Sequence, residues 1–357
     1  MKKLKVLGKI LAVCLTAAIM LTAASCADTS WALKVGDKTV PAGVYLGYLT
    51  DGYLTASYSV TDAETDLFKQ KIGDVDAATY IKNQAMTSSK TYLAVEKLFD
   101  EYKLSFTEEE IKENETEAEN YWKTYSAYYE DNGCGKESFK KMELMNKKYQ
   151  KVFAHYYGEN GKEPIAESER KEYFSENYAK LKYFTVSYSA HFKGVNTASD
   201  ATDAQKTELK GLVESYISRL NKGESFDKIS HEEADYSATE EHEHDHEHEE
   251  TEESEPTFIT KDTSEEPSAF NKAVFAAKAG VPTMTENGAS GYYVFVRYET
   301  NADSEDYTER AESVLSSMKS EDFTKIVEEY TKKMKFTENK SAIKRFKPQN
   351  IKLALTV

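Results

Sequence analysis

The feature that most constrains the fold of this chain is a change in the spacing of its apolar residues. Over residues 76–157, apolar and aromatic side chains recur every three or four positions, which is the period of amphipathic helices. Residues 305–336 repeat that pattern near the other end of the chain. Between them, runs of aromatic and β-branched residues at 181–192 and 290–300 are typical of strands. The pattern predicts a small α/β module, over roughly 180–300, between two helical regions.

In the N-terminal helical region, the sequence marks where individual helices begin and end. Two short β-like runs, at 32–36 and 38–42, flank a "GDK" turn and precede a helix. "TEEE" is a capping box in which Thr107 and Glu110 bond each other's backbone N–H groups, and it predicts a helix to about Glu130. A further helix is expected over 136–157, before Gly158.

The first residues have the layout of a secretory signal. Four lysines precede an apolar run of about 15 residues that is short for a membrane span, although a retained transmembrane anchor is the alternative. The run ends in "LTAASC", which resembles a bacterial lipobox. That resemblance implies cleavage after residue 25, lipidation of Cys26 and an extracytoplasmic protein held on the bacterial cell membrane by its lipid.

Charge and cysteine content narrow the class of protein further. The formal charge is −16, and removing residues 1–25 takes away four lysines and no acids, which gives −20. Such an acidic chain repels nucleic acid, so no nucleic-acid partner is expected. Cys134 is the one cysteine left after cleavage and lipidation, so no internal disulfide is possible. Its "DNGCGKE" context predicts an exposed loop thiol without a catalytic partner.

Five segments, in chain order, resemble the PrsA/SurA class of extracytoplasmic foldases. They read "VGDKTVPAGVYLGYL", "YKLSFTEEEI", "SERKEYFSENYAKLKYFTV", "RLNKGESFDKIS" and "PSAFNKAVFAAKAGVPTMTENGASGYYVFV". The resemblance implies an α+β fold: a discontinuous helical chaperone domain, similar to the N-terminal domain of SurA, with an inserted parvulin-like domain built on a small antiparallel sheet. Its implied partners are unfolded or nascent secreted polypeptides.

The domain boundaries that follow from this resemblance divide the chain into five parts. The expected parts are a signal peptide at 1–25, a lipidated tether at 26–30, the first helical part at 31–178, a parvulin-like domain at 179–300 with an acidic His-rich insert at about 236–256, and a returning helical part at 301–357.

The resemblance also implies positions for the parvulin-type prolyl isomerase site. The two family histidines fall at Thr185 and Tyr293, and the family Cys or Asp falls at Asp235 or Tyr236. Glu266 stands where the family has Met or Leu. Thr185 and Tyr293 either bond each other across neighbouring strands or are ordinary strand formers, and we favour the second interpretation. The expected isomerase activity is therefore weak or absent.

Two phenylalanines match the family's pocket and core positions, Phe270 and Phe275, and we expect them to contribute to peptide binding. His191, six residues after Thr185, is expected on a loop and is a poor substitute for a lost histidine. The many tyrosines of the helices, among them Tyr121 and Tyr125, are interpreted as helix packing or as a surface for clients. Client contact is expected in a groove between the two helical regions.

An acidic tract contains four histidines at alternate positions, His242, His244, His246 and His248. Imidazole and carboxylate groups bind Zn²⁺, but an unbraced tract gives weak and unselective binding, so no cofactor is required. The segment 232–266 holds sixteen acids and one lysine, and we expect it to be a solvated loop.

Two other functions stay open at this point. A zinc-binding or solute-binding surface lipoprotein would use the His-rich loop, although such proteins need further rigid ligands that this chain lacks outside the tract. The second of these functions is that of an adhesion or assembly module that binds no client polypeptide.

Overall fold

The fold is that of a computed structural model. The structure describes residues 30–60, 65–237 and 254–352. Contacts divide the chain into two compact units. Unit 1 combines the residues up to Pro164 with those from Glu321 onward, and unit 2 is the continuous segment Ile165–Ser320.

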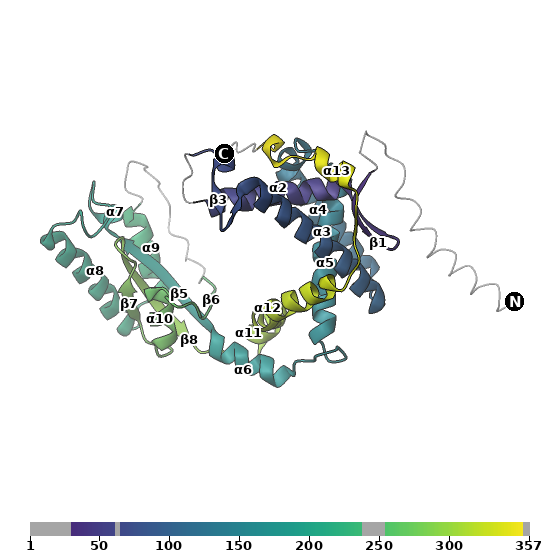
Figure 1. The fold of residues 1–357 in the computed structure, drawn as a ribbon. Helices are drawn as coiled ribbons and strands as arrows, with labels where there is room; N and C mark the ends of the chain where they lie inside the picture. Colours follow the sequence, from purple (N-terminus) through teal and green to yellow (C-terminus); the bar gives the residue numbers. More distant parts are fainter. Residues whose placement is uncertain (1–29, 61–64, 238–253, 353–357) are drawn as a thin grey trace. The chain divides into compact units, whose positions relative to one another are not determined.

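Unit 1 is mostly helical, with one three-stranded sheet and one two-stranded sheet (Figure 1). Its elements are β1 (Trp31–Val35), β2 (Lys38–Pro41), α2 (Ala42–Ser59), η1 (Leu67–Lys69), β3 (Lys71–Ile72), β4 (Val75–Asp76), α3 (Ala77–Glu101), α4 (Glu108–Glu130), α5 (Lys136–Tyr157), the second half of α12 (Ala311–Lys332), β9 (Thr337–Glu338), α13 (Lys340–Arg345) and η2 (Pro348–Asn350).

Several local predictions are confirmed in this unit. The short β pair forms β1 and β2 around the turn that contains Gly36, which has a φ of +59°. The capping box at the start of α4 has both of its bonds, since Glu110 N–H donates to Thr107 Oγ1 at 3.2 Å and Thr107 N–H donates to the Glu110 carboxylate at 2.7 Å. α4 ends at Glu130 as expected.

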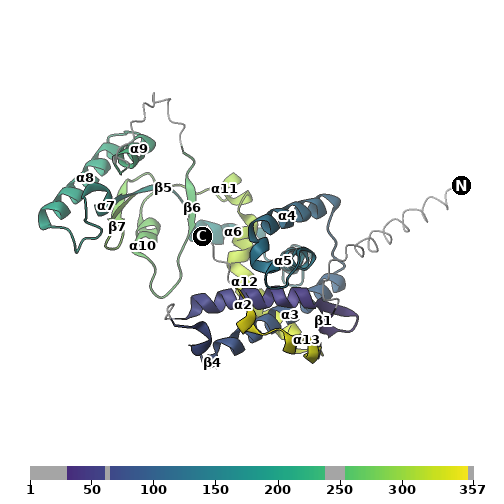
Figure 2. The ribbon, with the colours of Figure 1, turned by 90° about the horizontal axis from the view of Figure 1, so that it is seen from above.

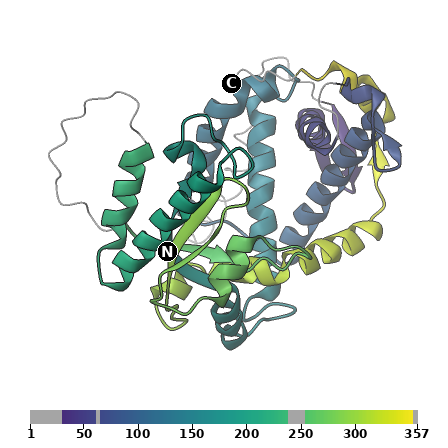
Figure 3. The same ribbon diagram turned by 90° about the vertical axis from the view of Figure 1, so that its left-hand side faces the viewer.

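The two parts of unit 1 are joined by strand pairing and by packing. β9 adds to β1 as an antiparallel neighbour, with Leu33 opposite Glu338 and Lys34 opposite Thr337. Figure 3 shows the yellow C-terminal segment beside the purple and blue N-terminal elements of this unit. The discontinuous helical domain expected from the sequence is therefore built by contacts between residues some 300 positions apart.

The side chain of Phe323 holds the second half of α12 against α5. It is fully buried, and its ring centroid lies 5.1–6.2 Å from four aromatic rings of α5 in edge-to-face arrangements. The four partners are Tyr149, Phe153, Tyr156 and Tyr157. Aromatic pairs of this geometry add to the free energy gained by burying their area.

Cys134 is buried, so the prediction of an exposed loop thiol is wrong. The turn after α4 presses it against α2 and α5, where its Sγ lies 3.9 Å from Met142 Sδ. A Cβ added to Gly47 of α2 would lie 2.3 Å from Met142 Sδ and 3.0 Å from Cys134 Sγ, so a larger residue there would displace the end of the Met142 side chain. Burial raises the pKa of the Cys134 thiol to about 12, with the Asp51 carboxylate adding to the effect.

The tyrosines of α4 do not form one buried stripe. Tyr121 and Tyr125 are about half exposed, and Ala118 is the one buried residue of the helix. By contrast, Tyr128 donates its hydroxyl to the Thr50 carbonyl of α2 at 2.7 Å. Packing against α2 therefore accounts for Tyr128, whereas Tyr121 and Tyr125 stay on the surface.

Unit 2 is an α/β module whose sheet has four antiparallel strands in the order β6–β5–β8–β7. Its elements are α6 (Glu167–Asn177), β5 (Tyr178–Ser187), α7 (Tyr188–His191), α8 (Asp203–Asn221), α9 (Phe226–Ser237), β6 (Thr257–Thr260), α10 (Ala269–Ala276), β7 (Thr283–Glu286), β8 (Gly291–Tyr298), α11 (Glu305–Thr308) and the first half of α12. The α+β fold class with a central antiparallel sheet is confirmed.

Helices cover both faces of this sheet, and alternation along β5 decides which residue faces which layer (Figure 2). Phe184 and Val186 point to the side covered by α8 and α9. Leu181, on the opposite face, packs with Val274 of α10 and Phe295 of β8. Each face of the sheet therefore has its own apolar core.

Part of the segment expected to be a solvated acidic loop is ordered. Residues 232–237 belong to α9, and Thr257–Thr260 form the edge strand β6, paired with β5. The prediction of a solvated loop is therefore wrong for these two stretches, because the charge of the segment as a whole hides the β-forming run "TFIT", while residues 238–253 lie outside the described residues. Phe258 and Ile259 of that run pack against two separate apolar clusters.

Two further details were also missed. β7 is a strand that the sequence analysis did not separate from the end of the module. The run 181–192 does not stay extended, because Ser187 caps the short helix α7 by accepting a bond from Ala190 N–H at 3.2 Å.

Unit 2 extends beyond the expected range of 179–300 at both ends. Phe174 of α6, Tyr178, Tyr307 of α11 and Val314 of α12 form one buried cluster. Lys180 on β5 also forms an ion pair with Asp306 at 2.9 Å. These contacts attach the flanking helices to the sheet, which explains why the unit spans Ile165–Ser320.

Phe323→Ala is expected to destabilise the chain by about 3–5 kcal/mol, because it removes a fully buried ring and leaves a cavity beside α5. Urea denaturation followed by circular dichroism measures the change. Tyr58→Ala is the control, since that ring is 80 % exposed and its loss should cost less than about 0.5 kcal/mol. Equal effects of the two substitutions would contradict the role given to Phe323.

Asp51→Asn is expected to stabilise the chain at pH 7.5 by about 1–3 kcal/mol. Burial raises the pKa of Asp51 to about 6 from 3.8, despite the bond from the Tyr129 hydroxyl, 2.7 Å away. A carboxyl with a raised pKa stabilises the folded state fully below pH 4, and that contribution is lost as the pH rises toward 6. The asparagine still accepts the Tyr129 bond and does not ionise.

The measurement is the free energy of unfolding from pH 4 to pH 7.5 for the wild type, Asp51→Asn and the exposed control Asp74→Asn. The loss of stability between pH 4 and pH 6 should be smaller in Asp51→Asn alone. A parallel pH profile for all three proteins would show that Asp51 is not the titrating group.

Candidate functional site

Three aromatic rings lie together on the α10 face of the unit 2 sheet. The Phe270 ring from α10 is stacked on Tyr293 of β8, with 4.3 Å between centroids and 33° between planes. Tyr183 of β5 packs at 5.2 Å from Phe270 and at 6.1 Å from Tyr293, and it is 46 % exposed. We call Tyr183, Phe270 and Tyr293 the aromatic trio.

Thr185 and Tyr293 are direct cross-strand partners in the register of β5 and β8. Thr185 is exposed, while Tyr293 is half-buried under Phe270. Within the described part of the chain, no side-chain hydrogen bond joins the two. The structure therefore brings these two predicted positions together, but the phenol ring makes an aromatic contact and no polar one.

The remaining predicted positions lie apart from this pair. Asp235 is exposed on α9, which covers the other face of the sheet. Glu266 is exposed before α10. Phe275 packs at the edge of the α10 core, with the Arg297 guanidinium 6.0 Å from its ring centroid. A polar cluster made of Thr185, Asp235 and Tyr293 is thus not assembled.

The other face of the sheet holds buried charged groups that the sequence analysis did not identify. Lys182 of β5 forms an ion pair with Asp227 of α9 at 2.6 Å, and both side chains are nearly inaccessible. Burial acts to raise the pKa of Asp227, but bonds from Lys182 and Ser254 outweigh it and hold the pKa below its usual value. Removing one partner of such a pair is costly, so this contact fixes α9 on the sheet.

His191 lies in the same region and is part of α7, not of a loop as expected. Its Nε2 is 2.8 Å from the Glu233 carboxylate, and the Tyr216 hydroxyl donates to the other oxygen of Glu233 at 2.9 Å. All three side chains are buried and connect α7, α8 and α9. The arrangement links three helices through buried polar contacts, which is a structural role.

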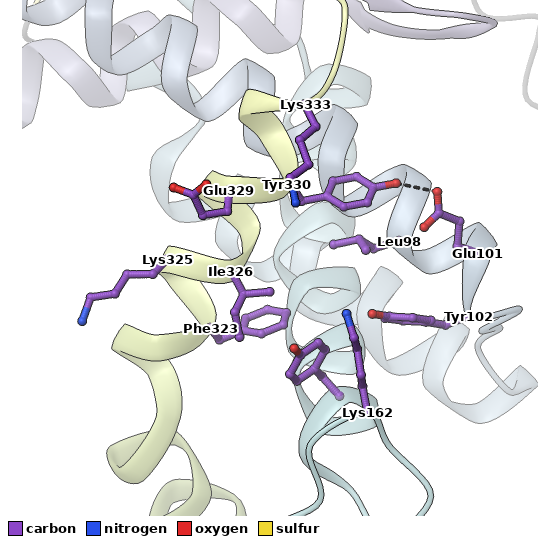
Figure 4. Close-up of a pocket in the computed structure, with 11 residues that line it drawn as sticks. Leu98, Glu101, Tyr102, Lys162, Phe323, Lys325, Ile326, Glu329, Tyr330 and Lys333 are labelled. Carbon is purple, nitrogen blue, oxygen red and sulfur yellow. Dashed lines mark hydrogen bonds between the residues drawn. The ribbon is translucent and has the colours of Figure 1, made fainter.

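Unit 1 contains a groove between α3, α5 and the second half of α12, with a volume of about 530 Å³. Its floor is apolar and aromatic, formed by Leu98, Tyr102, Tyr156, Phe323, Ile326 and Tyr330. Figure 4 shows these side chains converging from the three helices. We call this hollow the α3–α5–α12 groove.

Charged side chains border the groove, and one of them enters it. Lys325, Lys333, Glu101 and Glu329 stand at its edge, whereas Lys162 lies between Tyr102 and Phe323, with its Nζ 5.6 Å from the Tyr156 ring centroid (Figure 4). The Tyr330 hydroxyl donates to Glu101, which places the tyrosine ring along the groove wall. The groove is therefore a mostly apolar hollow with a charged margin, which suits loose contact with apolar side chains of a polypeptide.

Sequence reasoning placed client contact in the groove between the helical regions but did not identify its residues. Ile326 and Tyr330 lie one helical turn apart on α12, and this spacing predicts a shared face. Their partners Leu98 and Tyr102 come from α3, more than 200 residues earlier, and no local signal connects the two helices.

Several predicted residues cannot be placed. Cys26 and the four histidines His242, His244, His246 and His248 lie outside the described residues. Among residues 30–60, 65–237 and 254–352, no group of three or more His, Cys, Asp or Glu side chains is arranged to hold a metal ion. The helices found in those same ranges include none with the length and hydropathy of a membrane span.

Comparison with solved structures finds similarity to three PrsA proteins. The chain is similar in structure to PrsA foldases. The foldase protein PrsA of Lactococcus lactis is 14 % identical, with a TM-score of 0.34 over 90 % of this chain and 100 % of that one. PrsA of Bacillus subtilis is 19 % identical, with a TM-score of 0.31 over 74 % and 91 %.

The third structure is the foldase protein PrsA of Streptococcus pneumoniae str. Canada MDR_19A. It is 14 % identical, with a TM-score of 0.36 over 80 % of this chain and 95 % of that one. No family model matches the chain, and no curated protein sequence matches it.

Proposed function

We propose that this PrsA-like chain is a membrane-anchored, extracytoplasmic chaperone that binds unfolded secreted polypeptides. The observation that carries the proposal is the α3–α5–α12 groove, a hollow of about 530 Å³ whose walls are mostly apolar and aromatic side chains. Concave hollows of this volume with mostly apolar walls are where proteins usually bind ligands. Binding is passive: the groove shields apolar side chains of the client and needs no ATP.

The anchoring part of the proposal rests on the N-terminal sequence. The lipobox-like "LTAASC" supports lipidation of Cys26, and a lipid anchor would concentrate the groove where secreted chains emerge. The high negative charge supports the absence of a nucleic-acid partner.

The side chains on the α10 face of unit 2 are better suited to binding a peptide than to catalysing prolyl isomerisation. The barrier to rotation about an X–Pro bond is ~20 kcal/mol, and lowering it needs polar groups around a twisted amide. At the expected position the structure has the aromatic trio, and the Phe270 ring covers Tyr293 at 4.3 Å. The half-exposed Tyr183 leaves an aromatic surface on which a peptide can lie.

The groove is tested by removing apolar floor residues that are not part of the core. Tyr102→Ser/Ile326→Ser should weaken suppression of client aggregation roughly fivefold, because it removes apolar area from the floor. The assay is light scattering of a chemically unfolded secreted protein diluted with increasing amounts of the chain. An adhesion or assembly module without clients would show no suppression even as wild type.

The matched control is Tyr121→Ser/Ile111→Ser, which makes the same two replacements at exposed positions of α4. This variant should suppress aggregation as well as the wild type does. If the α4 variant loses activity and the groove variant keeps it, client binding belongs to the tyrosines of α4 and the proposed site is wrong.

Isomerase activity is tested separately by the refolding of a protein whose slow phase is proline isomerisation, which takes tens of seconds without a catalyst. The wild-type chain should accelerate that phase by less than about twofold, because neither expected position carries an imidazole. A tenfold acceleration that is lost in Tyr293→Phe would overturn this part of the proposal.

A further inference from the structure

The α3–α5–α12 groove is one of three hollows that surround the C-terminal end of α12. A second, of about 410 Å³, shares Tyr330 and Lys333 with the groove and reaches Val35 at the end of β1. A third, of about 450 Å³, shares Met334 with the second and is bordered by Phe336. The hollows share residues where α12 ends and lie on different sides of that end, and we call the residues that line them the α3–α12 basic surface.

The charge of this surface is opposite to that of the chain. Seven lysines line the three hollows, with three glutamates and no aspartate or arginine. The whole chain has 62 acidic and 46 basic residues, so lysine enrichment here is a local property. Glu329 pairs with Lys332 at 2.6 Å, which leaves six lysines and two glutamates, one of which, Glu101, accepts the Tyr330 hydroxyl.

Three lysines form the most cationic part of the surface. Lys97 of α3, with Lys333 and Lys335 after α12, lines the second hollow, and no acid is among the residues that line it. None of the three forms an ion pair within the described part of the chain. Lysine is a compact charge on a flexible stem, so these groups can reach carboxylates at variable positions.

The space between the lysines is apolar. Val35, Tyr330 and Met334 line the same hollow as the three lysines, and Lys90 lies over the Phe336 ring in the third one, 5.8 Å from its centroid. Charged headgroups or phosphates would leave these apolar side chains unused. An extended polypeptide, whose side chains alternate between two sides, presents apolar and acidic groups together.

We propose that the α3–α12 basic surface selects client segments in which carboxylates flank apolar side chains. This inference rests on the proposed binding of unfolded polypeptides and adds the charge preference of the site. The apolar strip binds the client, and the lysines at its margin favour acidic segments and speed their association.

The experiment uses the full chain in a neutral detergent and three labelled peptides of twelve residues. The peptides share the same apolar positions and differ in their flanking residues, which are glutamate, serine or lysine. Fluorescence anisotropy should show the glutamate peptide bound roughly fivefold more tightly than the serine peptide, and the lysine peptide most weakly. The difference should shrink at 0.5 M NaCl, where charges are screened over a few ångströms.

The test variant is Lys97→Glu/Lys333→Glu/Lys335→Glu, which should abolish or invert the preference for the glutamate peptide. Its matched control is Lys69→Glu/Lys71→Glu/Lys82→Glu, which changes the total charge equally at exposed lysines of unit 1 that line none of the three hollows. The control should keep the wild-type order of affinities. Circular dichroism of both variants checks that they fold.

The possible results separate the two proposals. Equal binding of all three peptides by the wild type, or an equal effect of both triple variants, overturns the charge preference and leaves the chaperone proposal standing. Absence of binding by every peptide, together with no suppression of aggregation, overturns both. Phosphatidylglycerol vesicles that displace the glutamate peptide through Lys97, Lys333 and Lys335 would assign the surface to the membrane and overturn the inference.

Discussion

The insertion of one phenylalanine into a cluster of aromatic rings is the contact on which the architecture depends. Phe323 returns the chain to α5 after the whole of unit 2 has been completed, and it is fully buried among four rings of that helix. Strand β9 then pairs with β1, which closes the small sheet. Without this return, α12 would not form a wall of the α3–α5–α12 groove, because Ile326 and Tyr330 follow Phe323 on the same helix.

The groove and its basic margin therefore exist only in the folded chain. Apolar floor residues come from both ends of unit 1, and so do the lysines, with Lys97 on α3 and Lys333 and Lys335 after α12. Such a surface combines weak, non-directional apolar contact with flexible charges. That combination suits a binding partner that has no fixed shape, and it explains how an acidic chain can attract acidic segments at one place.

Unit 2 illustrates how one aromatic side chain decides the character of a sheet face. Tyr293 and Thr185 occupy opposite positions in neighbouring strands, where a pair of polar groups would be well placed for chemistry. The larger phenol ring instead stacks under Phe270 and creates an aromatic surface with Tyr183. The buried pairs Lys182–Asp227 and His191–Glu233 attach α9 to β5 and to α7 on the other face of the sheet.

Local rules acting on the sequence determined most of the secondary structure: the capping box of Thr107 and Glu110, the β1–β2 turn, the long helices and the strands β5 and β8. These features depend on neighbours within a few residues, so pattern and propensity suffice. Only the tertiary structure decided the burial of Cys134, the strand β6 within an acidic stretch, and the groove, because each depends on residues far apart in the chain. Contacts at that separation leave no periodic signal in the sequence, since their partners are chosen when the helices pack.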